Sequence, residues 1–126
     1  MIIDKKAMCQ QIRGEKDVLY ISESGKSCPT EILEAISTFN AEGRPIWKPM
    51  HMQPIYRMNA FVTREGDGRA KTNAYISGGA LGKDGNPLDV GMDIFHRGLC
   101  LPSDNKMAPE QQNIIIEAVK RCFDGE

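Results

Sequence analysis

The segment 17–43, with the sequence DVLYISESGKSCPTEILEAISTFNAEG, decides the fold class of this chain. Its first six residues are rich in β-branched and aromatic side chains and have the length of a strand. A polar turn follows, and Pro29 then marks the start of a helix, because a proline in the first helical turn loses no hydrogen bond. Ser27 or Cys28 is the predicted N-cap, and Gly43 is the predicted end. The apolar side chains between them recur at helical spacing: Ile32, Leu33, Ala35, Ile36 and Phe39.

The flanking segments extend this unit into a single predicted domain over residues 1–126. The predicted order is an N-terminal linker helix (1–16), the strand and helix with a proline-rich motif loop (17–56), a glycine-rich insertion (57–87) and a helix–strand–helix unit (88–126). In the first segment, the helical pattern runs from Asp4 to Arg13 and is broken by Gly14.

The second half of the chain alternates irregular and regular segments. Residues 44–54 contain three prolines, which neither a long helix nor a central strand tolerates, so we expect a rigid, extended loop. The pattern then predicts a helix over 88–97, a brief buried strand over 99–103 and a last helix that begins at Pro109. In that last helix, the apolar face comprises Ile114, Ile115, Ala118, Val119 and Cys122. The predicted fold is therefore α/β of the α+β type: a small, few-stranded sheet packed with about three to four helices.

Composition sets limits on partners and location. The 126 residues are 40% hydrophobic and 26% charged, and 16 Lys and Arg against 17 Asp and Glu leave a net charge of −1. A nucleic-acid or anionic-membrane binder usually has a basic surplus, so neither partner is expected. The sequence has no apolar stretch long enough to cross a bilayer and no secretory leader pattern at its start, so we expect a cytoplasmic protein.

Four features with possible chemistry have simpler structural explanations. Ser24-Gly25-Lys26-Ser27 before a helix suggests a phosphate-binding loop, but Tyr20 stands where the full signature requires glycine. Asp84, Asn86 and Asp89 suggest calcium ligands, but the closing glutamate is absent, and a solvated turn explains them. The four cysteines are scattered without a C-x-x-C pair, so we expect structural thiols and no metal site. His96 lies near a predicted helix C-terminus, where it has a structural explanation.

The proline-rich loop gathers a more informative set of side chains. Arg44, Trp47, Lys48 and His51 combine a guanidinium, a stacking surface, a phosphate-compatible ammonium and an imidazole. These are groups that bind phosphate and planar ligands. The same composition also fits a loop that packs on its own domain with Trp47 buried, and the residue types alone leave both interpretations open.

Two longer motifs of the sequence resemble signatures of a known enzyme family. GRPIWKPMHMQP, residues 43–54, closely resembles a signature of DegT-type sugar-nucleotide aminotransferases. FHRGLCLPSD, residues 95–104, is similar to a second, C-terminal signature of that family, and the glycine-rich region between them resembles an insertion carried by some members. The resemblance extends from about Val18 to Phe123.

The resemblance implies a specific fold and activity. The family consists of fold-type I pyridoxal-phosphate enzymes, typically homodimers, which transfer an amino group to a keto-sugar attached to a nucleotide. This chain resembles their small C-terminal domain, which closes over the active site, and the implied substrate-binding residues are Arg44, Trp47, Lys48 and His51. The lysine that binds the cofactor covalently belongs to the family's large domain, whose motifs have no counterpart here.

We therefore expect no catalytic or cofactor-binding residue in this chain, which makes its status as an enzyme uncertain. Its expected partners are a nucleotide-sugar, a large domain or a full-length aminotransferase subunit, and a second copy in a homodimer. The alternatives are a stand-alone nucleotide-sugar-binding or regulatory module without catalysis, and a structural remnant without a ligand.

Overall fold

The structure, a computed structural model, describes residues 1–14, 16–56, 59, 61–62, 70–71 and 81–124. The chain divides into two compact units: the first unit comprises Met1–Ile46 with Arg97–Glu126, and the second unit comprises Trp47–His96. The single domain expected from the length stays a prediction. Within the described ranges, no helix is both long and apolar enough to cross a membrane.

The α+β prediction is confirmed, but the strands form separate pairs instead of one small sheet. The α-helices of the described residues are α1 (Pro29–Ser37), α3 (Val90–Arg97) and α4 (Pro109–Arg121). The antiparallel strand pairs are β1 (Gln11–Arg13) with β2 (Val18–Tyr20), β3 (Arg44–Pro45) with β6 (Leu99–Cys100), and β4 (Phe61–Val62) with β5 (Ala70–Lys71). Most of the predicted glycine-rich insertion, 57–87, lies outside the described residues.

The predicted helix from Asp4 to Arg13 is wrong. Only Lys5–Ala7 form a short 3-10 helix, and the chain then enters β1, where Ile12 lies opposite Leu19 of β2. The reason is the pairing available to the backbone: the Cys9 N–H donates to the carbonyl oxygen of Ser27 at 3.1 Å. Such tertiary partners outweigh the small free-energy differences in helix propensity that the local pattern reflects.

Helix α1 begins as predicted but receives its cap from another element. Cys28 is the N-cap and makes no side-chain cap bond. Instead, Gln11 of β1 provides the acceptor: its Oε1 accepts from the Thr30 N–H at 3.2 Å and from the Thr30 hydroxyl at 2.9 Å. The Ser27 hydroxyl donates to Glu31 Oε2 at 2.6 Å. Strand β1 thus holds the start of the helix in place.

The end of α1 differs from the prediction. Asn40, not Gly43, adopts the left-handed conformation, with φ of 58°. The Asn40 N–H donates to Ser37 O at 3.0 Å and the Ala41 N–H donates to Ile36 O at 3.3 Å, which is the pattern of a Schellman cap. Asparagine tolerates this conformation because its short polar side chain bonds locally.

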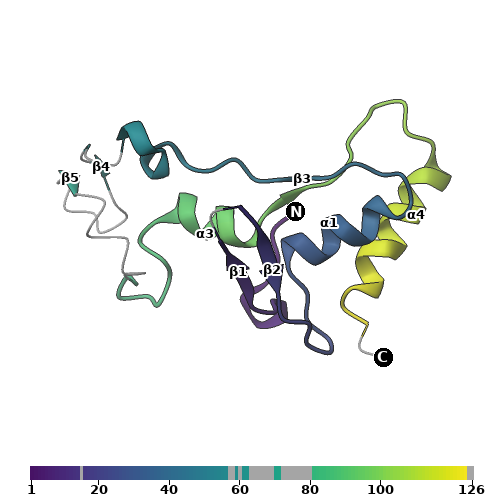
Figure 1. The fold of residues 1–126 in the computed structure, drawn as a ribbon, viewed down its shortest axis with the longest axis horizontal. Coiled ribbons are helices and arrows are strands. Elements are labelled where there is room, and N and C mark those ends of the chain that lie inside the picture. Colours follow the sequence, from purple (N-terminus) through teal and green to yellow (C-terminus); the bar gives the residue numbers. More distant parts are fainter. Residues whose placement is uncertain (15, 57–58, 60, 63–69, 72–80, 125–126) are drawn as a thin grey trace. The chain divides into compact units, whose positions relative to one another are not determined.

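The core of the first unit lies between α1, α4 and the β3–β6 pair. Figure 1 shows α1 and α4 side by side, and Ile36 of α1 is buried against Ile115 and Ala118 of α4. A second cluster joins Ile3, Ile32 and Leu99. Residues 1–3 run along β6, since the Ile3 N–H donates to Arg97 O and the Leu99 N–H to Met1 O, at 3.0 and 3.1 Å. Of the predicted helix faces, Phe39 and Ile114 lie outside this core, each about half exposed.

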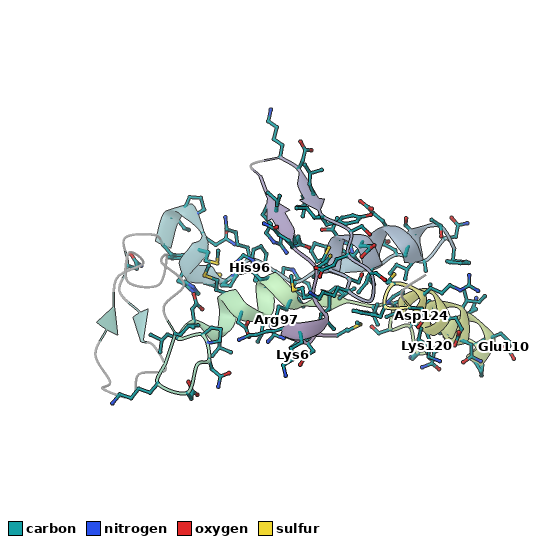
Figure 2. The ribbon with its side chains drawn as sticks, turned by 90° about the horizontal axis from the view of Figure 1, so that it is seen from below. Lys6, His96, Arg97, Glu110, Lys120 and Asp124 are labelled. Carbon is teal, nitrogen blue, oxygen red and sulfur yellow. The ribbon has the colours of Figure 1, made fainter. Side chains whose placement is uncertain are left out.

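The termini of α4 carry charges that suit the helix dipole. Glu110 lies in the first turn and Lys120 in the last, at opposite ends of the helix (Figure 2). Gln111 Oε1 accepts from the Ala108 N–H at 3.0 Å, which satisfies one backbone donor at the start. The predicted start at Pro109 is confirmed.

The second unit contains the motif loop from Trp47 onward, α3 except its last residue, and a tight turn. The loop is less extended than predicted, because Met50–Met52 and Pro54–Tyr56 form 3-10 helices. Pro49 and Pro54 stand at their starts, where a proline is tolerated. In the turn before α3, the Gly82 N–H donates to Asn86 O at 2.8 Å.

Candidate functional site

The structure places the four predicted substrate-binding residues in both units. Arg44 lies on β3 in the first unit, and Trp47, Lys48 and His51 lie in the second unit. The guanidinium of Arg44 lies 2.7 Å from Glu42 Oε1, and both side chains are exposed. An exposed ion pair of this kind contributes at most about 1 kcal/mol, so the guanidinium can exchange Glu42 for another anion at little cost.

Trp47 and Lys48 are exposed. The Trp47 side chain keeps 76% of its surface open, so it is not the buried anchor of one interpretation of the loop. Lys48 follows it, also exposed. An exposed indole next to an ammonium gives a flat apolar surface beside a positive charge, and this combination suits a planar ligand that carries phosphate.

Gln53 shapes the backbone of this loop. Its Nε2 donates to the carbonyl oxygen of Lys48 at 3.1 Å. The Met52 N–H donates to Pro49 O and the Gln53 N–H donates to Met50 O, each at 3.0 Å. These bonds close a compact turn, which limits the directions that Lys48 and the residues after it can adopt.

His51 is held by Asp89, a residue that the sequence analysis considered only as a calcium ligand. His51 Nε2 lies 2.5 Å from Asp89 Oδ2, and the two side chains are 21% and 9% exposed. The other carboxylate oxygen, Oδ1, accepts from the Met92 N–H at 2.9 Å. Asp89 therefore caps α3 and contacts His51 at the same time. An aspartate directly before a helix was the available sequence signal.

Helix α3 also contacts the loop through Gly91. A Cβ atom at this position would lie 3.3 Å from Pro49 Cγ, so the absence of a side chain permits the close approach. Pro49 and His51 of the motif loop thus pack against the start of α3 within the second unit.

The weaker candidates have structural roles. Lys26 forms an ion pair with Glu23 across the turn before α1, at 2.6 Å, as expected of a helix-entry turn. Asp84 Oδ1 accepts from the Asn86 N–H at 3.1 Å, within its turn. His96 stacks obliquely on Phe95, with 5.8 Å between ring centroids. In the part of the chain that the structure describes, no group of three His, Cys, Asp or Glu side chains could hold a metal ion.

Two of the four thiols are buried, and two have a raised pKa. Cys9 and Cys28 are buried, and all four cysteines are free. Burial and a hydrogen bond to the Cys28 thiol raise the pKa of Cys9 to about 12. Burial also raises the pKa of Cys122. Because the thiolate is the form that attacks electrophiles and binds metals, these values agree with the expected structural role.

The described residues do not fit pyridoxal phosphate. A lysine that binds this cofactor covalently needs a sequestered site in which its amine is desolvated. Every lysine whose side chain the structure describes is exposed except Lys26, which is half-buried and paired with Glu23. No step of a reaction is therefore assigned to this cofactor on the described residues.

Comparison with known proteins gives one relative. The chain is 30% identical over 95 residues to "Putative pyridoxal phosphate-dependent aminotransferase EpsN" of Bacillus subtilis (strain 168). The match covers 75% of this chain but only 19% of the relative, so the chain spans about a fifth of that protein's length. No family model and no solved structure matches the chain. Most of the chain is thus related to one part of a protein with this name.

Proposed function

We propose that this chain is part of a pyridoxal-phosphate-dependent aminotransferase that acts on nucleotide-linked keto-sugars. The observation that carries the aminotransferase part of the proposal is the 30% identity over 95 residues to a protein named a putative pyridoxal phosphate-dependent aminotransferase. The motif in residues 43–54 adds the substrate class, because it resembles the sugar-nucleotide branch of these enzymes. The cofactor and its covalent lysine belong, in this proposal, to a large domain outside the chain.

The role of this chain is to bind the nucleotide-sugar. Trp47 offers its indole face to the base or the sugar ring, and the Lys48 ammonium offsets the charge of the diphosphate. The imidazole of His51 forms a hydrogen bond to the sugar or phosphate. The resemblance also assigns substrate binding to Arg44, whose exposed guanidinium can exchange Glu42 for another anion. The exposure of Trp47 and Lys48 supports these roles, since both groups are open to a ligand.

Fluorescence of the purified chain tests the binding role, because Trp47 is the single tryptophan of the sequence. We expect UDP- and dTDP-hexoses at millimolar concentration to quench its emission in a saturable manner, with excitation at the red edge to avoid absorption by the base. Lys48→Ala should weaken this binding about tenfold, because a charged hydrogen bond to phosphate is lost.

Lys83→Ala is the matched control, since Lys83 is another exposed lysine of the second unit. Its effect on the binding curve should be negligible. A wild-type chain whose emission does not respond to any of these ligands would contradict the proposed binding role. If Lys83→Ala weakens ligand binding as much as Lys48→Ala does, the attraction is nonspecific, and the proposed role of Lys48 is wrong.

A further inference from the structure

We propose that Asp89 is a positioning residue for His51: it holds the imidazole in one orientation and with its proton on Nε2, ready for the nucleotide-sugar. This inference rests on the proposed function, in which His51 contacts that ligand. It follows from the 2.5 Å separation of His51 Nε2 and Asp89 Oδ2 and from the low exposure of both side chains.

The chemistry of the His51–Asp89 pair determines which ring nitrogen of His51 carries the proton. An ionised carboxylate has only acceptor atoms, so a hydrogen bond of this length requires that Nε2 carries a hydrogen. A neutral His51 is then the Nε2–H tautomer, in which Nδ1 has the lone pair. The aspartate thereby decides which hydrogen-bonding atom each side of the ring offers.

Helix α3 fixes the carboxylate in turn. Asp89 Oδ1 accepts from the Met92 N–H at 2.9 Å, at the N-terminus of the helix, where the dipole interacts favourably with negative charge. One oxygen is thus occupied by the helix and the other faces His51. Because Gly91 lies against Pro49, the same helical turn also contacts the chain two residues before His51. Helix α3 therefore contributes to the direction of the ring through Asp89.

The Asp89→Asn variant distinguishes an effect on the orientation and tautomer of His51 from an effect on folding. Asparagine is as good an N-cap as aspartate, so its Oδ1 can keep the bond to the Met92 N–H and preserve α3. Its Nδ2 then faces His51 Nε2 and donates to it, which moves the ring proton of a neutral imidazole to Nδ1. The variant is nearly isosteric, yet it reverses the tautomer, and a purely structural role for Asp89 predicts no such reversal.

The experiment is a long-range ¹⁵N–¹H spectrum of the histidine side chains, recorded at increasing pH until the imidazole signals no longer change, so that the neutral rings are observed. The chain has two histidines, and His51→Gln assigns the signals. We expect the Nε2–H pattern for His51 in the wild type and the Nδ1–H pattern in Asp89→Asn. Asp84→Asn, which removes a carboxylate from a turn of the same unit, is the control and should leave the His51 pattern unchanged.

Binding is then measured with the same UDP- and dTDP-hexoses. Asp89→Asn should bind about tenfold more weakly than the wild type, since the ring offers the wrong group to the ligand, while the melting temperature stays close to that of the wild type. An unchanged tautomer in Asp89→Asn overturns the inference, and so does a reversed tautomer with unchanged binding. If the wild type does not bind these ligands, the proposed function is wrong. The tautomer spectra still test whether Asp89 determines the ring nitrogen of His51 that carries the proton.

Discussion

Glycine is required at position 43 for a packing reason that the neighbouring sequence does not reveal. The sequence indicated a helix end at this glycine, but α1 ends at Ser37 and Asn40 takes the left-handed position. A Cβ atom on Gly43 would lie 2.6 Å from both Ile36 Cδ1 and Leu33 Cδ2, and 3.0 Å from Cys100 O. The glycine is needed because β6 and the core face of α1 leave no space for a methyl group.

Substitution of Gly43 by alanine should therefore destabilise the chain by about 1–3 kcal/mol, the range for overpacking a core. Chemical denaturation with urea measures this change in the free energy of unfolding. Glu42→Ala is the matched control, because its exposed ion pair with Arg44 contributes less than about 1 kcal/mol. If Gly43→Ala is as stable as the wild type, the close packing at this position is wrong.

The residue types of the motif loop indicated side chains that can bind phosphate and planar ligands. They did not indicate which residues those side chains contact in the fold. Exposure of Trp47 and Lys48 agrees with one of the two interpretations that the sequence left open. The contact between His51 and Asp89 joins residues 38 positions apart, and no local pattern encodes such a distance. The helix was predicted to begin at residue 88, so Asp89 was not identified as its cap, and its second oxygen has a partner that only the folded chain brings close.

At the scale of elements, β1 and α1 depend on each other. The sequence placed residues 4–13 in a helix because Ala7, Met8 and Ile12 share one helical face, whereas it predicted the start of α1 correctly from its proline. Strand β1 instead pairs with β2 and supplies Gln11 to the start of α1. Local periodicity could not reveal this, since the partners that favour the strand are provided by β2 and Ser27.

Gln11→Ala should destabilise α1, because the Thr30 N–H and hydroxyl both lose their acceptor. The expected loss in the free energy of unfolding is about 1 kcal/mol, as for removal of a helix N-cap. Circular dichroism during thermal unfolding reports it.

Gln10→Ala provides the comparison, since Gln10 precedes Gln11 and its side chain is exposed. We expect a change of no more than about 0.5 kcal/mol for this variant. Similar losses for both variants would show that alanine weakens the strand itself, and the proposed capping by Gln11 would then be rejected.

At the scale of the whole molecule, the sequence predicted the α+β class and the positions of all three described α-helices, but not how the strands pair. Strands of two or three residues leave almost no alternation to read, and residues 1–3, which run along β6, belong to a segment predicted as helical. The β3–β6 pair joins residues more than fifty positions apart. Such pairings are determined by the core around Ile32 and Leu99, to which the two ends of the chain contribute.

Labelling of the whole chain with pyridoxal phosphate tests the proposal that the cofactor site lies in another domain. The described lysine side chains are exposed or ion-paired, so none is set apart as a covalent site for pyridoxal phosphate. Incubation with the cofactor, borohydride reduction and peptide mapping by mass spectrometry should give scattered, substoichiometric adducts on several lysines. The urea-denatured chain is the control and should show the same distribution, because surface amines react alike in both states. One stoichiometric adduct at a single lysine of the native chain, lost in urea, would mean that the chain contains a cofactor site of its own, and the assignment of that site to another domain would be wrong.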